Sequence, residues 1–561
     1  MEIAAKNRRV DIALALGLGV AAVLAVTLTL RDVGLSYDEP ENIEFQTRMR
    51  TWLGLLVRAG DGVTPRKALS SETFERYWSY ETRRHLHPPM AGYLANMAWW
   101  AFHRWMGEPW SYRMASAILF GLLVALLYGE ARAAWGRLSG VGAAAALVLM
   151  PRVFGHAHLA VTDTPAMVLW FVCWVTFRPV ATGRPKGHVP WGRMVLFGAA
   201  LGLSLLTRFT NWLVVVPLGL WAARFRWRIP WRWLWVAGAA ALVAAVGLNP
   251  RWWRDPAGWI YLFVQASLTR GSYSTLPTYF LGRTYPFNLP WYNAPLLTAA
   301  TTPVAILVLF AVGLAAACRD RLRTDLGAFA AMTVIFLWVA RGLPQAPGHD
   351  GIRLFLPAFP LVAALAGGGL SALGRFCRRP RSAGAALLAL MVLSAGYQLV
   401  RTHPYHLSYY SEIVGGPAGA QRLGLETTYW WDAATDEFLD LINDRSILPP
   451  NAQVYAIPGW PTLRYWQEVG RLRQDIVFVS EEEDFGKIEF LILLCRQGKF
   501  SRRGGEFDPG APPPQRPPGY TEEALWRWYR TWDRQWGAFA PRHGVPLIVL
   551  VRHGAGGALL R

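Results

Sequence analysis

Two adjacent carboxylates follow the first long apolar run of this 561-residue chain, in the stretch Gly34-Leu35-Ser36-Tyr37-Asp38-Glu39-Pro40-Glu41-Asn42. A carboxylate is costly to place in hydrocarbon. We therefore expect Asp38 and Glu39 at the water edge of a bilayer, where an acid and its neighbour can be poised for proton transfer.

The same reasoning places further acids, histidines and arginines on this side of the membrane. They are Glu41, Asp163, His85, His87, His156, His158, His349, Arg152, Arg208, Arg251, Arg254 and Arg353. Arginine on the outer side departs from the rule that Lys and Arg stay in the cytoplasm, so these arginines indicate an anionic partner such as a phosphate or diphosphate. Together, acids and phosphate-binding arginines predict transfer of a group from a lipid-linked phosphate to a hydroxyl. The arginines, with or without a divalent cation, would stabilise the phosphate leaving group.

The composition is that of a multi-span helical membrane protein. Hydrophobic residues make up 53% of the chain and charged residues only 17%, against about a quarter in soluble domains. The 29 tryptophans fit aromatic belts at both interfaces. The net charge of +20 lies in short segments between apolar runs, as membrane topology and anionic lipid require, so we expect no nucleic acid partner. The four cysteines are scattered and predict neither a disulfide framework nor a metal site.

Apolar runs long enough to cross a bilayer predict eleven membrane spans. They are 11–30, 112–131, 139–154, 165–177, 194–207, 212–223, 233–248, 293–317, 325–343, 354–373 and 383–400. Lys6, Arg8 and Arg9 precede the first run, so we expect the N-terminus in the cytoplasm and Asp38 outside. The strongly basic short loops then all fall on the cytoplasmic face.

Two parts are expected: a transmembrane module at 1–400 and an outer domain at 401–561. The first outer loop, 31–111, contains pieces at 39–57 and 90–106 that are apolar on one side and predict helices at the interface. The tail has strand-like runs at 453–457, 475–479, 490–494 and 547–551, a helical stretch at 433–444 and a Pro-rich linker at 509–518. We therefore predict a mixed α/β domain in the periplasm, beside a bacterial inner membrane.

Four short motifs occur in order along the chain. They are Tyr37-Asp38-Glu39-Pro40, His87-Pro88-Pro89-Met90-Ala91-Gly92-Tyr93, Ala160-Val161-Thr162-Asp163-Thr164-Pro165 and Leu206-Thr207-Arg208. In this order, and at matching sides of the membrane, they resemble the C-fold (GT-C) integral membrane glycosyltransferases. The protein O-mannosyltransferases and aminoarabinose transferases, of the glycosyltransferase family 39 type, are the closer look-alikes. The resemblance extends over residues 10–400.

The resemblance implies roles for the residues of these motifs. Asp38 stands at the family's first-loop acid, the catalytic base or acceptor-positioning group, with Glu39 as its partner. Asp163 matches the second-loop acid, and Arg208 matches a basic residue that is often Lys. The implied reaction transfers a sugar from a polyprenyl-phosphate donor, with inversion at the anomeric carbon, to a lipid, glycan or protein acceptor. The expected substrate contacts are Arg208, Arg152, His87, Tyr93, Arg251, Arg254 and Arg353.

The resemblance also suggests a metal site. His87 stands where some relatives place a metal-contacting residue, so His87 and Asp163 are the candidate ligands of a divalent cation, Mg, Mn or Zn. This chain departs from the pattern here, because relatives that use a cation commonly have an acid at the position of His87.

Each candidate also has a structural interpretation. Asp38 could cap the following helix, with Glu41 completing a capping box, and Asp163 could cap another helix. Further alternatives are lipid-headgroup contacts for Arg251 and Arg254, an ion pair with Asp350 for Arg353, and plain loop positions for His156 and His158.

Two classes of function remain open: a glycosyltransferase, and a flippase or transporter of a lipid-linked sugar or other anionic lipid. A transporter should carry charges in mid-span and consist of two similar halves. Here the charges gather at the outer ends of the spans and no halves repeat. A glycosyltransferase fold that has lost catalysis and acts as a scaffold is a third interpretation.

Overall fold

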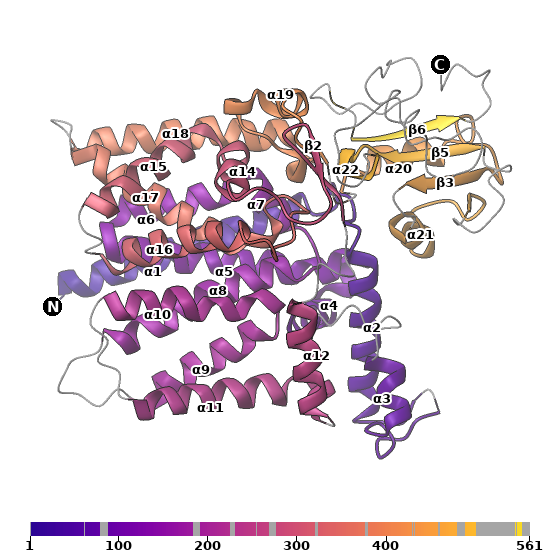
Figure 1. The fold of residues 1–561 in the computed structure, drawn as a ribbon, viewed down its shortest axis with the longest axis horizontal. Helices are drawn as coiled ribbons and strands as arrows, with labels where there is room; N and C mark the ends of the chain where they lie inside the picture. Colours follow the sequence, from indigo (N-terminus) through magenta and orange to yellow (C-terminus); the bar gives the residue numbers. More distant parts are fainter. Residues whose placement is uncertain are drawn as a thin grey trace.

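A computed structural model gives the fold, in which long helices lie side by side and form the larger part of the molecule (Figure 1). The structure describes residues 2–60, 62–78, 88–182, 191–224, 231–253, 255–268, 276–319, 324–375, 380–428, 430, 432–457, 461–479, 489–500, 545 and 547–552. Five helical segments are long and apolar enough to cross a membrane. They are α1 (Glu2–Leu28), α5 (Trp110–Trp135), α8 (Asp163–Ala181), η3 (Arg353–Ala358) with α17 (Phe359–Arg375), and α18 (Pro380–Thr402). The chain is a multi-pass membrane protein, as its composition predicts.

Shorter helices complete the bundle. They are α6 (Arg137–Val148), α9 (Trp191–Leu205), α10 (Val215–Arg224), α11 (Trp231–Gly247), α15 (Val304–Arg319) and α16 (Asp325–Arg341). Two predicted spans are not single helices: 139–154 divides into α6 and α7 (Pro151–His156), and 293–317 into α14 (Asn293–Thr301) and α15. Proline causes both breaks, at Pro151 and Pro303, because it lacks an N–H donor and disfavours helical conformation in the residue before it. The predicted span 212–223 begins with a 3-10 turn, η1 (Phe209–Val214), before α10.

The segment that begins with Arg353 is the most buried of the long ones, because α17 packs closely on both sides. A Cβ atom on Gly367 would lie 2.4 Å from the carbonyl oxygen of Ser139 in α6. One on Gly369 would lie 2.0 Å from that of Leu309 in α15. Such close approach between helices is typical of membrane bundles and needs small residues. The packing of α17 therefore fixes where Arg353 stands.

Three helices run crosswise at one end of the bundle (Figure 1): α2 (Glu39–Leu55), α3 (Ser71–Trp78) and α12 (Pro256–Leu268). Helix α4 (Met90–Met106) packs against α2 and α5. Helices α2 and α4 coincide with the helices predicted at 39–57 and 90–106. Trp52 meets Phe74 and Trp78 edge-on, with ring centroids 5.9 and 5.2 Å apart, so α2 and α3 enclose a small aromatic core of their own.

The tail contains a four-stranded sheet in the order β4-β3-β5-β6. Its strands are β3 (Gln453–Ile457), β4 (Val477–Phe478), β5 (Phe490–Leu494) and β6 (Ile548–Arg552). Strand β3 is parallel to β4 and β5, whereas β6 is antiparallel to β5. The tail also contains the helices α20 (Asp436–Asn443) and α21 (Pro461–Glu468). Each of the four predicted strand-like runs overlaps one of these strands.

Short elements connect the sheet with the bundle. They are the hairpin of β1 (Thr278–Phe280) and β2 (Arg283–Tyr285), the turns η4 (His406–Ser408) and η5 (Glu412–Val414), and the helices α19 (Gly416–Arg422) and α22 (Gln497–Phe500). Figure 1 shows the hairpin and α22 where the sheet meets the bundle. One continuous cluster of buried apolar side chains extends from the bundle helices into the sheet. Sheet and bundle are therefore packed as one structure.

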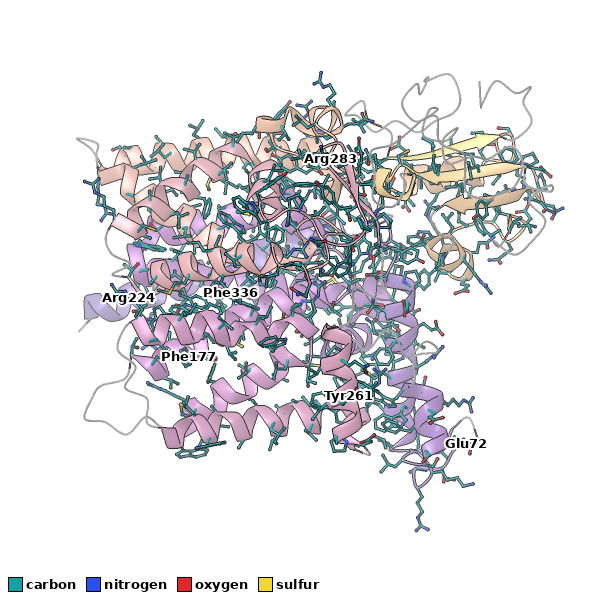
Figure 2. All side chains as sticks on the ribbon, viewed as in Figure 1. Glu72, Phe177, Arg224, Tyr261, Arg283 and Phe336 are labelled. Carbon is teal, nitrogen blue, oxygen red and sulfur yellow. The ribbon has the colours of Figure 1, made fainter. Side chains whose placement is uncertain are left out.

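The opposite end of the bundle has its own ion pairs. Figure 2 shows Arg224 at the end where the chain begins, and Glu72, on α3, at the other end. Near the start of α1, Asp11 bonds Arg132 and lies 2.6 Å from the Nε atom of Arg137. These contacts tie α1, α5 and α6 together far from the crosswise helices.

Candidate functional site

Arg353 is the centre of a buried charge network at the end of the bundle where the crosswise helices lie. Its Nη1 donates to Asp350 Oδ2 at 2.8 Å, and its Nε lies 3.2 Å from Asp163 Oδ2. Its Nη2 donates to Asp38. The guanidinium also lies over the ring of Trp430, 3.9 Å from the ring centroid. One arginine therefore joins carboxylates and an indole from four distant parts of the sequence.

Asp38 is the acid of this network that water reaches most easily. Its side chain is 31% exposed, whereas those of Asp163 and Asp350 are 0% and 4% exposed. Asp38 occupies the N-cap position of α2, but its side chain makes no capping hydrogen bond. The capping interpretation is wrong, because the carboxylate bonds Arg353 instead. The structure therefore presents one carboxylate to solvent, held by a guanidinium behind it.

Glu39, the next residue, makes a different set of contacts. Its carboxylate accepts from Arg113 at 2.8 and 3.0 Å, and from the backbone N–H groups of Ser36 at 2.8 Å and Ala160 at 2.9 Å. Arg113 also donates to the carbonyl oxygens of Leu30, Val33 and Gly34. Both side chains are fully buried. The Glu39–Arg113 pair thus fixes the first outer loop to α5 and to the segment before α8.

Asp163 begins α8, and two arginines share its carboxylate. Arg208 Nη1 donates to Oδ1, and Arg353 Nε lies 3.3 and 3.2 Å from the two oxygens. Arg208 follows α9 in an extended conformation. The turn after it is held by Asn211, whose Nδ2 donates to the carbonyl oxygen of Ala166 at 3.1 Å. The Asp163 carboxylate therefore serves the arginines and is not a mere helix cap.

A left-handed turn directs Asp350 toward Arg353. Asp350 and Gly351 have φ values of 62° and 56°, in a region that Asp and Gly tolerate better than most residues. Asp350 Oδ1 lies 3.4 Å from Arg496 Nη2. Burial alone would raise the pKa of Asp350, but the charges of His349, Arg496 and Arg353 outweigh it and hold this pKa well below its usual range. Asp350 is therefore an anion between two arginines, and the predicted Arg353–Asp350 ion pair is present.

Arg341, the last residue of α16, is a further arginine near this network. Arg341 is 6% exposed, and the charges of Arg208 and Asp350 act on its guanidinium. Its Nη1 donates to the carbonyl oxygen of Pro347, whereas Nε and Nη2 have no hydrogen-bond partner in the described part of the chain. A buried guanidinium is costly unless an anion meets it. Arg341 therefore marks a place for an anionic group.

His156 and His158 are buried, and His158 lies in the turn after α7, as the interpretation of these residues as loop positions predicts. His158 bonds the Thr29 hydroxyl and the Phe154 carbonyl oxygen, each at 2.8 Å. His156 ends α7 and packs on Trp430, with ring centroids 5.6 Å apart. Burial lowers the pKa of His156 to about 4, so its ring is neutral near pH 7 and offers no positive charge to a phosphate.

The described donors around Arg353 do not fit a divalent cation. Both oxygens of Asp163 are engaged by Arg208 and Arg353. Among the residues that the structure describes, no group of three or more His, Cys, Asp or Glu side chains could hold a metal ion. His87, the other predicted ligand, lies outside the described residues, so a cation at His87 and Asp163 stays a prediction.

Arg152, a predicted substrate contact, is buried beside the network. Its Nε donates to the carbonyl oxygen of Tyr409 at 2.9 Å, and its guanidinium lies 4.5 Å from the ring centroid of Tyr410. With Glu426 and Gly351 it lines a small cavity of about 20 Å³, which is the room that one water molecule needs. Arg152 is therefore built into the protein interior in this structure.

The remaining predicted contacts lie elsewhere. Arg251 is buried and donates to the carbonyl oxygen of Trp78 at 2.8 Å, so the alternative of lipid-headgroup contact does not hold for it. Tyr93 packs against the aromatic core between α2 and α3. Arg254 lies outside the described residues. The structure thus assembles Asp38, Asp163, Arg208 and Arg353, but not Arg251 or Tyr93, around one centre.

Comparison with known proteins bears on the part of the chain that carries Asp163 and Arg208. Residues 86–250 match the model of the family described as dolichyl-phosphate-mannose-protein mannosyltransferase. The predicted family resemblance is confirmed. No functionally curated protein matches the chain.

Two solved structures illustrate the similarity. The structure of ArnT from Cupriavidus metallidurans bound to undecaprenyl phosphate is 15% identical, with a TM-score of 0.48 over 85% of this chain and 92% of that chain. Archaeal oligosaccharyltransferase AglB from Archaeoglobus fulgidus, in complex with an inhibitory peptide and a dolichol-phosphate, is 13% identical. Its TM-score is 0.43 over 86% of this chain and 69% of that chain.

The part that matches the mannosyltransferase family supplies only part of the network. Asp163 and Arg208 lie within residues 86–250, whereas Asp38, Arg341 and Arg353 lie outside them. Sequence reasoning missed Arg341, which lies within the predicted span 325–343 near its end, and Arg496, which stands in the tail. The signal for Arg341 was the one that indicated Arg208, namely an arginine at the predicted outer end of a span.

Proposed function

We propose that this protein is an integral membrane glycosyltransferase that moves a sugar from a polyprenyl-phosphate donor to a hydroxyl acceptor at the outer face of the cytoplasmic membrane. One observation carries the proposal. A partly exposed carboxylate, Asp38, stands on a buried arginine network near which Arg341 has two nitrogens without a partner in the described residues. The transfer needs a group that accepts a proton and a group that receives a phosphate.

In the proposed reaction, the acceptor hydroxyl oxygen attacks the anomeric carbon on the face opposite the phosphate. A new C–O glycosidic bond forms while the C–O bond to the phosphate breaks. Asp38 takes the hydroxyl proton, and the electron pair of the broken bond leaves with the polyprenyl phosphate. The family resemblance supports the inversion that this geometry implies.

The leaving phosphate gains negative charge, so fixed positive charge near it lowers the barrier. Arg341 suits this task because Nε and Nη2 lie on one edge of the guanidinium and can bind two phosphate oxygens together. Arg208 stands near Arg341 and already pairs with Asp163. We therefore propose that Arg341 binds the donor phosphate and that Arg208 adds long-range positive charge.

The other predicted site residues take supporting roles in this proposal. Asp163 orients Arg208 and Arg353, whose guanidinium groups it holds. Glu39 anchors the loop that carries Asp38 and is not the proton acceptor, because four hydrogen bonds already engage its carboxylate. Arg152, buried beside the network, has a structural role in this proposal, because it donates to the carbonyl oxygen of Tyr409.

The proposal extends to topology and partners. We propose eleven spans with the N-terminus in the cytoplasm of a bacterium, and residues 401–561 as a periplasmic domain that meets a lipid, glycan or protein acceptor. A cation held by His87 and Asp163 would compete with Arg208 and Arg353 for the Asp163 oxygens. The proposed transfer therefore relies on guanidinium groups, and no nucleic acid takes part.

The test compares wild type, Asp38→Asn and Glu44→Gln as purified proteins, with labelled polyprenyl-phosphate sugars and cell-envelope fractions. Glu44 is a matched control, because it also lies on α2 but is 62% exposed and pairs with Arg48 at the surface. We expect transfer by wild type and by Glu44→Gln. In Asp38→Asn, transfer should fall by about 100-fold or more, because a positioned general base typically contributes that much.

Two results would argue against the proposal. Equal transfer by Asp38→Asn and wild type would exclude Asp38 as the base. Movement of labelled lipid across the membrane of wild-type vesicles, without transfer to any acceptor, would favour the flippase.

A further inference from the structure

The C-terminal sheet delivers a charged side chain to the membrane site. Strand β5 ends at Leu494, and Arg496 follows it and is 5% exposed. Its Nη2 lies 3.4 Å from Asp350 Oδ1, and its Nε lies 3.6 Å from Glu426 Oε1. Asp350 in turn bonds Arg353 at 2.8 Å. A chain of two ion pairs therefore connects the end of β5 with the centre of the site.

Arg496 occupies a place in the sheet where α/β domains commonly bind ligands. Strand β3 lies between β4 and β5, and the chain passes from β4 on one side of β3 to β5 on the other. The order of the strands therefore reverses between β3 and β5. In open parallel sheets, ligands bind in the crevice at the carboxyl ends of the two strands where the order reverses. In this protein the residue after β5 reaches the Asp350 turn of the bundle. The functional edge of the sheet thus faces the membrane site.

Glu426 fixes Arg496 from the other side. Its Oε1 accepts hydrogen bonds from the backbone N–H groups of Tyr279 at 3.2 Å and Gly498 at 3.1 Å. A Cβ atom on Gly498 would lie 2.3 Å from the carbonyl oxygen of Pro277, so α22 and the β1 strand are in close contact. The hairpin, the segment after α19 and the sheet are therefore joined at the residue that holds Arg496.

We infer that Arg496 is a positioning residue of the membrane site, through which the C-terminal sheet sets the orientation of Arg353. Asp350 is shared between Arg496 and Arg353 and lies 3.9 Å from His349 Nε2. Loss of Arg496 would therefore leave this buried carboxylate with Arg353 as its one arginine partner among the described residues, and the balance of charge on Arg353 would change. Arg353 is also the group that holds Asp38. Removing Arg496 should therefore displace the proposed base, although Arg496 contacts neither Asp38 nor a reacting group.

The catalytic test rests on the proposed function and compares Arg496→Ala, Arg496→Lys and Arg473→Ala in the full chain. In Arg496→Ala, kcat should fall by about 10- to 100-fold, as expected for a displaced catalytic group. The KM for the donor should change by less than about threefold, because uniform donor binding is unaffected. Arg496→Lys should give an intermediate kcat, because one ammonium keeps the charge but cannot reach both acids as the guanidinium does.

Arg473→Ala is the matched control. Arg473 is another largely buried arginine of the tail, which lies 3.1 Å from Asp475 and donates to the carbonyl oxygen of Leu448 at 2.6 Å, away from the membrane site. Its replacement should lower thermal stability but leave kcat near the wild-type value. An equal loss of kcat in Arg473→Ala and Arg496→Ala would overturn the inference, because the effect would then be general destabilisation.

Hydrogen exchange tests the same connection without any activity. Arg496→Ala should raise amide exchange in the turn around Asp350 and in η3, whereas Arg473→Ala should not. Unchanged exchange there in Arg496→Ala would overturn the inference. If wild type shows no transfer, the proposed function fails while this measurement still decides the role of Arg496. Where transfer is measurable, the double variant Asp350→Ala with Arg496→Ala should have a kcat only slightly lower than that of Asp350→Ala alone. Additive losses of kcat would count against the connection from Arg496 through Asp350 to Arg353.

Discussion

Replacing Glu39 by Gln should destabilise the first outer loop before it affects any proton transfer. The Glu39 carboxylate accepts four hydrogen bonds, two of them from Arg113, and both side chains are fully buried. A glutamine has nearly the same shape but leaves the guanidinium without its counter-charge, which costs about 3–5 kcal/mol in a buried pair. We therefore expect Glu39→Gln to lose about that much stability.

A double replacement tells this anchor apart from an ordinary buried ion pair. Exchanging both partners of such a pair for apolar residues is often nearly neutral. Here Arg113 also satisfies the carbonyl oxygens of Leu30, Val33 and Gly34, and Glu39 satisfies two backbone N–H groups. Each of these five groups would lose its partner at a cost of about 1–3 kcal/mol. The double variant Glu39→Met with Arg113→Met should therefore be no more stable than Glu39→Gln.

The assay is thermal unfolding in one detergent, combined with hydrogen exchange over residues 30–42. Glu39→Gln should show a lower unfolding midpoint and faster exchange in that loop, and Glu44→Gln should resemble wild type in both. If Glu39→Gln were as stable as wild type and yet inactive, Glu39 would take part in the chemistry and its role as an anchor of the loop would be refuted.

Three further predictions follow from single contacts. Arg341→Ala should weaken binding of a polyprenyl phosphate by about tenfold or more, as loss of a charged hydrogen bond implies. Arg319→Ala, which changes an exposed arginine at the end of α15, should leave this binding unchanged. Equilibrium binding of labelled lipid to the two variants is the measurement. Burial raises the pKa of Asp432 to about 7. Between about pH 4 and about pH 7 the folded protein therefore keeps a proton that the unfolded chain has released, so the free energy of unfolding should fall as the pH rises through this range. Asp432→Asn should remove that dependence in thermal unfolding between pH 5 and about 8. A Cβ atom at Gly34 would lie 2.5 Å from the carbonyl oxygen of Asp432, so Gly34→Ala should destabilise by about 1–3 kcal/mol, whereas Gly54→Ala on α2 meets open space and should not.

The elements could be predicted because local signals specify them. Apolar runs bounded by basic residues marked most of the bundle helices, and apolar runs in the tail marked all four strands of the sheet. The breaks at Pro151 and Pro303 were missed because hydropathy counts a proline inside an apolar run as part of the span. Tertiary packing then decides that the pieces on either side separate into α6 and α7, or α14 and α15.

The site could be predicted only where a charged residue departs from the usual distribution of charges in a membrane protein. Asp38, Arg208 and Arg353 were found because each is charged and lies, in the predicted topology, on the side of the membrane where its charge needs a partner. The anchoring role of Glu39 could not be read in the same way, because adjacent residues in a chain can point to different partners. Its partner Arg113 stands near the start of a predicted span, where sequence gives no reason to connect it with a loop 74 residues away.

Charge balance explains why so many distant segments must meet for this site to form. The buried or partly buried arginines around the centre are Arg208, Arg341, Arg353 and Arg496, and the acids are Asp38, Asp163, Asp350 and Glu426. Only Asp350 and Arg353 among these residues are paired within one segment. The segments that carry Asp163, Arg208 and Arg496 would each bury an unpaired charge if they packed alone, at a cost of several kcal/mol. The bundle and the sheet therefore stabilise each other through these ions. In the assembled state the charges cancel in number, yet Arg341 lacks a carboxylate at ion-pair distance in the described part of the chain. In the proposed reaction, the donor phosphate would pair with Arg341 and need not displace an acid that the fold requires elsewhere.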